Sequence, residues 1–317
     1  MEPSGFAYGL HKMGIRQDRY LNWIFDNRIY APNLFNLPGK IYYVDCRVTA
    51  SGNGSSWAAA FKTIQEAITA NNADIDWGAT PWLVDNYILI ASGEYAEALS
   101  VPFTCHMIGM GVLGTDTAVE IHPAVGSAMA GTFLGTHVSN IRFETTEATV
   151  DTLNIGTCNN SLIENCEIVC GVAGGGAGTA YISTVNCTHL RVYNCSFQYG
   201  GAGTPHNYGI YFGGGANKYA HHVDIRDNLI QGIRAAGVGI HIPANCTATN
   251  AVIRENIIKI PTTGKGIEDL NGNSLCVNNF ITVAGAGDAI SHAGGAGMTI
   301  NNQTVVNGTA LRETAYA

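Results

Sequence analysis

A six-residue pattern recurs seven times along the chain: an apolar residue, any residue, an Asn, Asp or Glu, two further residues, and a second apolar residue. The central residues are Asn140, Asn165, Asn194, Asp227, Glu255, Asn278 and Asn302, which are 25, 29, 33, 28, 23 and 24 residues apart. One unit of this length is too short to bury a core alone, so the repeat predicts a solenoid of stacked coils.

Each coil is predicted to consist of short strands. Apolar residues alternate with a period of two around each central residue, and Asn tolerates the left-handed backbone conformation of a tight bend. A second column, Ile182, Ile210, Ile240, Ile267 and Ile290, advances in step with the first. A coil of roughly 23–33 residues fits three strands and three turns, and no helical or leucine-rich spacing persists. The chain is therefore predicted to be an all-β, single-stranded parallel β-helix with three sheets and about nine or ten coils.

Stacking also predicts an interior and a ladder. At the strand spacing of about 4.8 Å, equivalent Asn side chains can hydrogen-bond along the axis. Two columns are expected to fill the interior. They are Val138, Ile163, Val192, Ile225, Ile253, Cys276 and Ile300, and Phe143, Ile168, Phe197, Ile230, Ile258, Ile281 and Val305. Near the N-terminus, Phe61, Ile64, Ala67 and Ile68 share one face of a predicted short helix, which can cap the open end of the solenoid.

The opening of this region resembles a known superfamily. Tyr43-Val-Asp45, the Gly-Asn-Gly loop before Trp57, Ile64-Gln-Glu-Ala-Ile68 and Ile88-Leu-Ile-Ala-Ser-Gly-Glu-Tyr95 are similar to the start of pectin-lyase-like proteins. The resemblance covers about residues 40–310 and implies a right-handed β-helix. It implies little about function, because that superfamily includes lyases, hydrolases, epimerases, phage tailspikes and inert virion proteins. The motifs of polygalacturonases (Asn-Thr-Asp, Asp-Asp, His-Gly, Arg-Ile-Lys) and of pectate lyases (Arg-x-Pro-x-x-Arg) do not occur.

Charge and composition exclude several classes of function. Residues 1–40 carry five basic and three acidic side chains, net +2, and the remaining residues carry 11 − 21 = −10, which argues against nucleic acid as a partner. No apolar run approaches the ~18 residues of a membrane span, and Met1–Gly5 lacks the features of a secretory signal. We therefore expect no membrane partner and synthesis in a cytoplasm without a signal peptide.

No cofactor or metal is expected. The nine cysteines include no CxxC pair and no zinc-ligand spacing, so they are interpreted as small buried side chains in a reducing compartment. The segment His221–Asp227 contains two His and two Asp, but strand alternation directs His221 and His222 to opposite faces.

Residues 1–40 lie outside the repeat and are predicted to be a separate arm, with residues 41–317 forming the β-helix domain. The arm holds seven of the 28 aromatic residues, and residues 16–28 could form a short helix. Aromatics beside arginines are typical of interface hot spots. The candidate interface residues are Arg16, Arg19, Tyr20, Trp23 and Phe25. Docking to another protein and packing onto the arm's own β-helix both remain open.

One outward column is a candidate glycan site. Tyr211, His241, Glu268 and Ser291 each follow a residue of the second isoleucine column, and the residues before that column (Gly209, Gly239, Gly266 and Ala289) are expected to leave a shallow groove. If the protein is an enzyme, Glu268, His241 and Tyr211 are the predicted acid/base residues. The alternative is a solvated polar stripe, in which these side chains are exposed and Glu268 is a weak general acid.

A second outward column becomes apolar. Leu229, Ile257 and Phe280 follow one another two residues after the central residue of each repeat, and such a surface needs a cover. A neighbouring chain in a homotrimer and a loop of the same chain are the two alternatives.

Taken with the resemblance to phage members of the superfamily, these features favour a non-catalytic structural and binding protein of a bacteriophage-type virion. It would be a capsid decoration or a tail spike or fibre component, located on the virion surface. Its expected partners are virion proteins, through residues 1–40, and a surface polysaccharide. The alternative function is a polysaccharide lyase or glycoside hydrolase that acts on bacterial surface glycan.

Overall fold

The computed structural model describes residues 15–17, 23–25, 39–75, 86–147, 149–171, 178–201, 204–213, 218–292, 297–306 and 309–313. The chain divides into two compact units, Met1–Pro38 and Gly39–Ala317. In the first unit, β1 (Ile15–Gln17) and β2 (Trp23–Phe25) pair antiparallel, with Arg16 opposite Ile24. The predicted helix over residues 16–28 is therefore wrong, because Trp, Ile and Phe favour an extended pair. Arg16, Trp23 and Phe25 lie on these strands, whereas Arg19 and Tyr20 lie outside the described residues.

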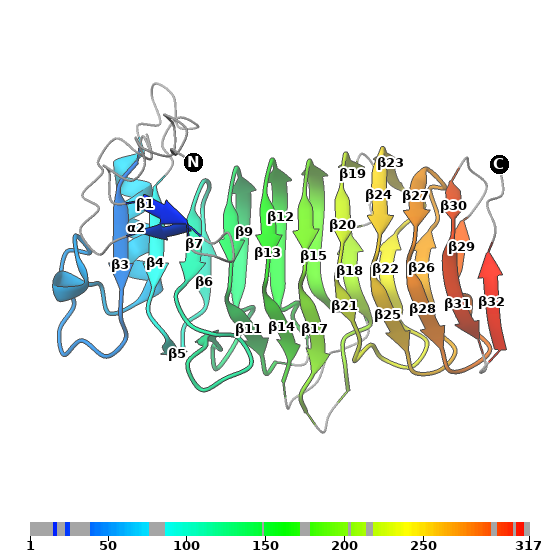
Figure 1. Cartoon of the computed structure of the whole chain (residues 1–317), viewed down its shortest axis with the longest axis horizontal. Helices are drawn as coiled ribbons and strands as arrows, with labels where there is room; N and C mark the ends of the chain where they lie inside the picture. The colour runs from blue at the N-terminus through cyan, green and yellow to red at the C-terminus, as the bar shows by residue number, and fades with distance from the viewer. Residues whose placement is uncertain are drawn as a thin grey trace, which may run out of the picture. The chain divides into compact units, whose positions relative to one another are not determined.

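The second unit is a right-handed parallel β-helix of three sheets. Figure 1 shows the strands of successive coils side by side along this unit. The first sheet consists of β3 (Ile41–Val44), β4 (Tyr87–Ile90), β7 (His106–Gly109), β10 (His137–Ser139), β13 (Leu162–Glu164), β16 (Arg191–Tyr193), β20 (Asp224–Arg226), β24 (Ala251–Arg254), β27 (Ser274–Val277) and β30 (Met298–Ile300).

The second sheet ends in the one antiparallel pair of the β-helix unit's described strands, β31 with β32. It consists of β5 (Gly93–Tyr95), β8 (Val119–Ile121), β11 (Arg142–Thr145), β14 (Glu167–Cys170), β17 (Ser196–Tyr199), β21 (Leu229–Ile230), β25 (Ile257–Ile260), β28 (Phe280–Val283), β31 (Asn302–Val306) and β32 (Thr309–Glu313).

The third sheet carries the candidate glycan column. Its main path is β6 (Leu99–Val101), β9 (Met129–Leu134), β12 (Leu153–Asn159), β15 (Ala180–Thr188), β18 (Tyr208–Phe212), β22 (Val238–Ile242), β26 (Lys265–Asp269) and β29 (Ile290–His292). Two further strands, β19 (Lys218–His221) and β23 (Cys246–Thr249), extend it beside β15.

A helix closes the first coils, as predicted. After a short 3-10 turn, η1 (Trp57–Ala59), α2 (Ile64–Asp74) begins at a capping box formed by Thr63 and Glu66, and it contacts β3, β4 and β6. The carboxylate of Glu97 accepts the amide hydrogens of Ile64 (2.7 Å) and Gln65 (3.0 Å), so two otherwise unpaired donors of the first turn are satisfied. Ile64, Ala67 and Ile68 are buried, and Phe61 precedes the helix.

The bend between the first and second sheets contains the predicted column of left-handed residues, with one correction. Asn140, Asn165, Asn194, Asp227, Glu255 and Asn278 have φ between 49° and 58°, and the seventh member is Asn301 (φ 52°) rather than Asn302. The sequence pattern selected Asn302 because its flanking positions, Ile300 and Val305, are apolar, whereas those of Asn301 are threonines. With the bend at Asn301, the inner residues of the last coil are Thr299 and Thr304, which pair with Cys276 and Ile281, and not Ile300 and Val305.

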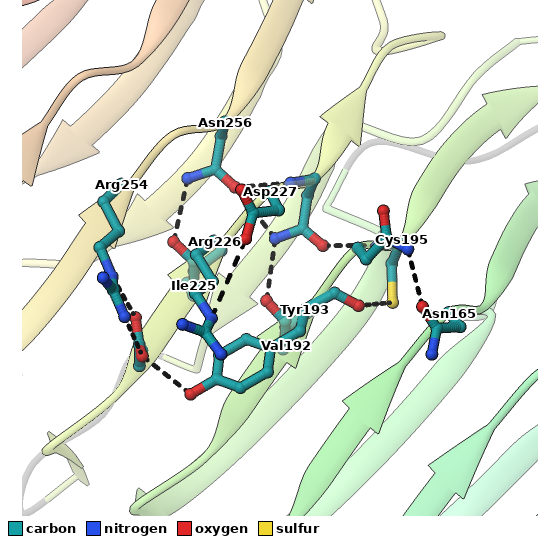
Figure 2. Close-up of polar contacts among 12 residues, drawn as sticks. Asn165, Val192, Tyr193, Cys195, Ile225, Arg226, Asp227, Arg254 and Asn256 are labelled. Atoms are coloured by element: carbon teal, nitrogen blue, oxygen red, sulfur yellow. Dashed lines mark hydrogen bonds and ion pairs between the residues drawn. The ribbon is translucent and has the colours of Figure 1, made fainter. Parts of the chain in front are cut away.

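The main asparagine ladder lies one residue further along and faces the interior. The amide Oδ1 of Asn256 accepts from the backbone and side-chain nitrogens of Asn228 (3.1 and 2.9 Å), and Asn279 and Asn302 continue the same bonding. Each Nδ2 also donates to a backbone carbonyl of the preceding coil, such as Asn256 to Ile225 (3.0 Å; Figure 2). All four side chains are buried and fully bonded, which is how polar groups are tolerated inside a protein.

The remaining predicted inner columns are buried in register. Val138, Ile163, Val192 and Ile225 are cross-strand neighbours in the first sheet, and Phe143, Ile168, Phe197 and Ile230 are neighbours in the second. All nine cysteines are free thiols, and eight of them are buried. They fill small spaces in the core, as expected from the sequence.

Candidate functional site

The third sheet brings the predicted site residues together on consecutive strands. Tyr211 on β18 pairs in register with His241 on β22, His241 with Glu268 on β26, and Glu268 with Ser291 on β29. The spacing in sequence therefore identified four side chains that occupy one column of the sheet. Neighbouring strands lie about 4.7–4.9 Å apart, so each side chain contacts the next.

Aromatic rings stack at one end of this column. The ring of Tyr211 lies 5.6 Å from that of His241, with 6° between their planes. Tyr208, three residues earlier on the same strand, stacks on both, at 4.8 Å from Tyr211 and 5.1 Å from His241. The sequence did not identify Tyr208, because strict alternation would place it on the face opposite Tyr211.

The glycines of this region explain why Tyr208 and Tyr211 share a face. A methyl group on Gly209 would lie 2.7 Å from Cγ2 of Ile230, and one on Gly239 would lie 2.7 Å from Cγ2 of Ile258. Both glycines therefore face the interior beside the inner isoleucines, and they are buried. The expectation that they form the floor of a surface groove is wrong. They instead allow two consecutive residues of each strand to face the interior. This interrupts the alternation that would otherwise place Tyr208 and Tyr211 on opposite faces.

His241 and Glu268 lie in close, largely buried contact. Nδ1 of His241 lies 2.8 Å from Oε2 of Glu268, and Lys265 forms an ion pair with Oε1 of the same carboxylate. The side chains of His241 and Glu268 are only 10 % and 12 % exposed, so the expectation of an exposed stripe is wrong. Burial lowers the pKa of His241, and the neighbouring Glu268 only partly opposes this effect. The imidazole is consequently neutral at pH 7.

The far end of the column is structural. Ser291 follows Glu268, and the next pair along these strands is Asp269 with His292. Asp269 is fully buried and accepts hydrogen bonds from the amides of Gly272 (2.8 Å) and Ser274 (2.8 Å) and from the Ser274 hydroxyl (2.7 Å). Burial alone would raise the pKa of Asp269, but bonds from His292, Ser274 and Gly272 hold it well below its usual value. This carboxylate fixes the turn after β26.

Asp151 is a candidate that the sequence did not reveal. Its carboxylate accepts hydrogen bonds from the amide of Ala180 (2.7 Å) and from the hydroxyl of Ser183, which is the neighbour of Tyr211 in the column. Burial raises the pKa of Asp151, although the two hydrogen bonds oppose the shift. The column was the one sequence signal that could have led to Asp151, because Ser183 occupies the same column as Tyr211, one strand earlier.

The apolar column on the second sheet is also in register. Leu229 pairs with Ile257, and Ile257 pairs with Phe280. Ile257 is 44 % exposed and Phe280 is 39 % exposed. The structure therefore places these three candidates on one outer face.

The histidine cluster does not converge on a metal. His222 occupies a left-handed bend (φ 52°), and its ring stacks on His189 at 4.7 Å, whereas Asp224 lies on the outer face of the first sheet. Within the described ranges, no three His, Cys, Asp or Glu side chains are grouped so that they could hold a metal ion.

Comparison with known proteins gives no relative: no protein family, no curated protein and no solved structure matches the chain. No helix in the described part of the chain is long and apolar enough to span a membrane. The fold and the geometry of its outer faces are consequently the basis for any proposal on function.

Proposed function

We propose that this chain is a non-catalytic binding protein of a bacteriophage-type virion, a capsid decoration or a tail spike or fibre component, that holds a surface glycan along its third sheet. The observation that carries the proposal is the stack of Tyr208, Tyr211 and His241 beside the Lys265–Glu268 ion pair. Flat aromatic rings offer contact area at little cost in side-chain entropy, and adjacent charged groups can bond hydroxyls. An extended sugar chain parallel to the axis meets one such strand after another.

Binding can be measured with polysaccharide isolated from a bacterial surface. Replacement of Tyr211 by Ala removes one ring of the stack, so we expect binding about ten-fold weaker, or about 1.4 kcal/mol. Tyr219→Ala is the matched control, because Tyr219 stacks on His221 on the separate strand β19. Equal affinities for the wild-type chain and Tyr211→Ala would reject the third sheet as the binding face.

Assembly requires separate measurements. The arm, residues 1–40, is proposed to dock on other virion proteins, with Trp23 as an anchor. We expect Trp23→Ala to reduce co-sedimentation with purified particles.

The column of Leu229, Ile257 and Phe280 is proposed to be the contact of a homotrimer. We expect light scattering to give three times the chain mass. A monomer at micromolar concentration would reject the trimer.

Catalysis is the second candidate, because the His241–Glu268 pair is largely buried. Glu268 faces Nδ1 of His241, which leaves Nε2 of a neutral imidazole to exchange a proton with a ligand, as in a polysaccharide lyase or hydrolase. Two other buried carboxylates do not complete a hydrolytic pair with Glu268. The carboxylate of Asp269 is occupied by hydrogen bonds within its own turn. Asp151 bonds Ser183, which lies three strands, or about 14 Å, from Glu268. This separation exceeds the roughly 6.5–9.5 Å between the two carboxylates of inverting enzymes.

Product analysis distinguishes the two candidates. We expect no cleavage of pectin, polygalacturonate, alginate or host polysaccharide by the purified chain. Cleavage that is lost in Glu268→Gln, with an unchanged melting temperature, would replace the binding function with a depolymerase. Cleavage that persists in Glu268→Gln would place the active site elsewhere and would reject Glu268 as its acid or base.

A further inference from the structure

The outer face of the first sheet gathers three arginines on three successive strands. Arg191 is on β16, Arg226 on β20 and Arg254 on β24. They are three of the 11 basic residues in a region that carries 21 acidic ones. Such a concentration on one face of an otherwise acidic solenoid is not needed for the fold, because these side chains point away from the inner columns.

Arg254 is engaged in a closed network. Its Nε and Nη2 donate to the two carboxylate oxygens of Asp224 (3.2 and 3.1 Å), and Oη of Tyr193 donates to Oδ2 of Asp224 (2.8 Å; Figure 2). Burial on its own would raise the pKa of Asp224, but the bonds from Arg254 and Tyr193 lower it. Asp224 is therefore ionised and satisfied, and the network fixes the position of the Tyr193 ring.

Arg226 is positioned by that ring and, in the described part of the chain, forms only a long ion pair, with Asp227. Its guanidinium carbon lies 3.9 Å from the centroid of the Tyr193 ring, a cation–π contact that holds the planar group flat (Figure 2). Its buried Nε has no hydrogen-bond acceptor among the described residues, and Oδ2 of Asp227 is 4.0 Å away. Because Nε itself is buried, an anion would bind at the terminal nitrogens of the guanidinium, whose side chain is 36 % exposed.

Arg191 supplies a second cation beside it. Arg191 is exposed, is the cross-strand neighbour of Asp224, and forms no ion pair within the described ranges. It is the diagonal neighbour of Arg226, and diagonal positions on adjacent strands are about 7–8 Å apart, within reach of two long side chains. Asp224 does not compete for Arg191, because Arg254 and Tyr193 occupy it. Glu164, the other carboxylate beside Tyr193, is paired with His137 (2.9 Å).

A hollow continues from this cluster toward the later coils. Its volume is about 480 Å³, its floor includes Val252 and Leu275, and its walls include His222, Asn250, Arg254 and Asp224. Arg191 and Arg226 lie beside the hollow and do not line it. An apolar floor with polar walls suits a ring that has an apolar face and hydroxyl edges. Glu255 also lines the hollow, but it lies at the bend and is exposed.

We propose that the first sheet binds the anionic group, a phosphate or a carboxylate, of a sugar-sized ligand. Arg191 and Arg226 bind the anion from two strands, since guanidinium groups match both oxyanions with paired donors. The hollow over Val252 and Leu275 accommodates the ring that carries the anion. This site is on a different sheet from the column of Tyr211 and does not depend on the glycan-binding function proposed for that column.

Calorimetric titration of the full chain at low ionic strength tests the site. The probes are glucose 6-phosphate, glucuronate, inorganic phosphate and glucose. We expect glucose 6-phosphate or glucuronate to bind at least ten-fold more tightly than glucose, and the stronger of the two identifies the anion. Inorganic phosphate should bind more weakly than glucose 6-phosphate if the hollow accommodates the ring.

Two variants and a control assign the binding to these residues. Arg191→Gln/Arg226→Gln should weaken binding of the preferred anion at least ten-fold, and Arg226→Lys should give an intermediate loss because it keeps the charge without the fork. Arg234→Gln, outside the first sheet, should change nothing. The proposal is overturned if no anion binds at 20 mM, or if the double variant and Arg234→Gln have equal effects. It is also overturned if glucose binds as tightly as the anions. Because Tyr211→Ala should leave this titration unchanged, failure of one site is distinguishable from failure of the other.

Discussion

The outer face of the second sheet changes character along the solenoid. In its early strands the outward column consists of Glu94, Glu120, Arg142 and Glu167, and Arg142 forms ion pairs with Glu120 (3.3 Å), Glu144 (2.9 Å) and Glu167 (3.2 Å) beside a hollow of about 540 Å³. In its later strands the same column consists of Leu229, Ile257 and Phe280. One half of the column is therefore a charged network and the other half is an apolar stripe.

The inner columns behind the two halves do not change in this way. Ile168 packs between Phe143 and Phe197 in the early coils, and Ile258 packs between Ile230 and Ile281 in the later ones. All six are completely buried. Packing therefore constrains these two inner columns to one chemistry, while the backbone ladder leaves each outer position free to take on a function.

One interior column does differ between the halves. At the position after each left-handed bend, the early coils have Ile141, Cys166 and Cys195, and the later coils have the bonded ladder that runs from Asn228 to Asn302. The thiol of Cys195 bonds only weakly, to carbonyl oxygens at 3.3 and 3.7 Å. The later coils therefore replace apolar contact with a continuous chain of amide hydrogen bonds.

The largest effects should come from the shared interior. Ile168→Ala and Ile258→Ala should each lower the free energy of unfolding by about 2–5 kcal/mol, because each leaves a cavity between two stacked neighbours. Chemical denaturation followed by circular dichroism measures both. The two losses should agree within about 1 kcal/mol if both halves share one core. A loss confined to one half would show that the halves are packed differently.

Acid should weaken the interior mainly at one histidine, His206. His206 is fully buried, its ring nitrogens lie 2.9 and 3.0 Å from the hydroxyls of Thr179 and Thr152, and burial lowers its pKa to about 4. The unfolded chain, with a His pKa near 6.5, binds the proton first as the pH falls. Stability should thus be unaffected above pH 6.5 and should fall by up to about 3 kcal/mol between pH 6.5 and 4.

The same denaturation series at several pH values measures this dependence, and His206→Gln should flatten it. Asp269, whose pKa is held below its usual value, contributes stability that is lost only at lower pH, below the usual Asp range. A slope that persists in His206→Gln between pH 6.5 and 4 would assign the acid sensitivity to other groups.

The differing interior column should give an intermediate effect. Asn256→Ala leaves donors of Asn228 and the carbonyl of Ile225 unpaired inside the core, so we expect a loss of about 1–3 kcal/mol. Cys195→Ala removes only weak bonds and a small volume, and should cost about 1 kcal/mol or less. Unfolding measurements on the two variants compare an amide ladder with apolar contact at equivalent positions. A larger loss for Cys195→Ala would show that apolar contact stabilises this column more than the amide ladder does.

The smallest effects should come from the outer column. Ile257→Ser should change the unfolding free energy of the isolated chain by about 0.5 kcal/mol or less, since surface substitutions away from special features rarely cost more. The measurement is repeated over a range of protein concentrations. At concentrations where the proposed trimer forms, the loss should exceed about 1 kcal/mol and grow with concentration. A loss that stays small at every concentration would count against the trimer contact.

The sequence by itself determined the repeating parts of this protein. The left-handed bends from Asn140 to Asn278, the inner columns up to Ile281, and the register of Tyr211, His241, Glu268 and Ser291 all follow from alternation and coil length. These are local properties, because an apolar residue two positions from another must share its face. The error at Asn302 occurred because the inward residues of the last coil are Thr299 and Thr304, so the apolar pattern fitted only the neighbouring asparagine, and pairing with the preceding coil fixed the register.

The tertiary structure alone decided what surrounds those residues. The inward direction of Gly209, the burial of His241 and Glu268, the contact of Asp151 with Ser183, and the placement of Arg226 on Tyr193 each join segments of different coils. Such contacts depend on which strands are neighbours and on how each corner turns. Periodicity specifies that a side chain points outward, but only the stacking of complete coils decides whether it meets water, a ring or a charge.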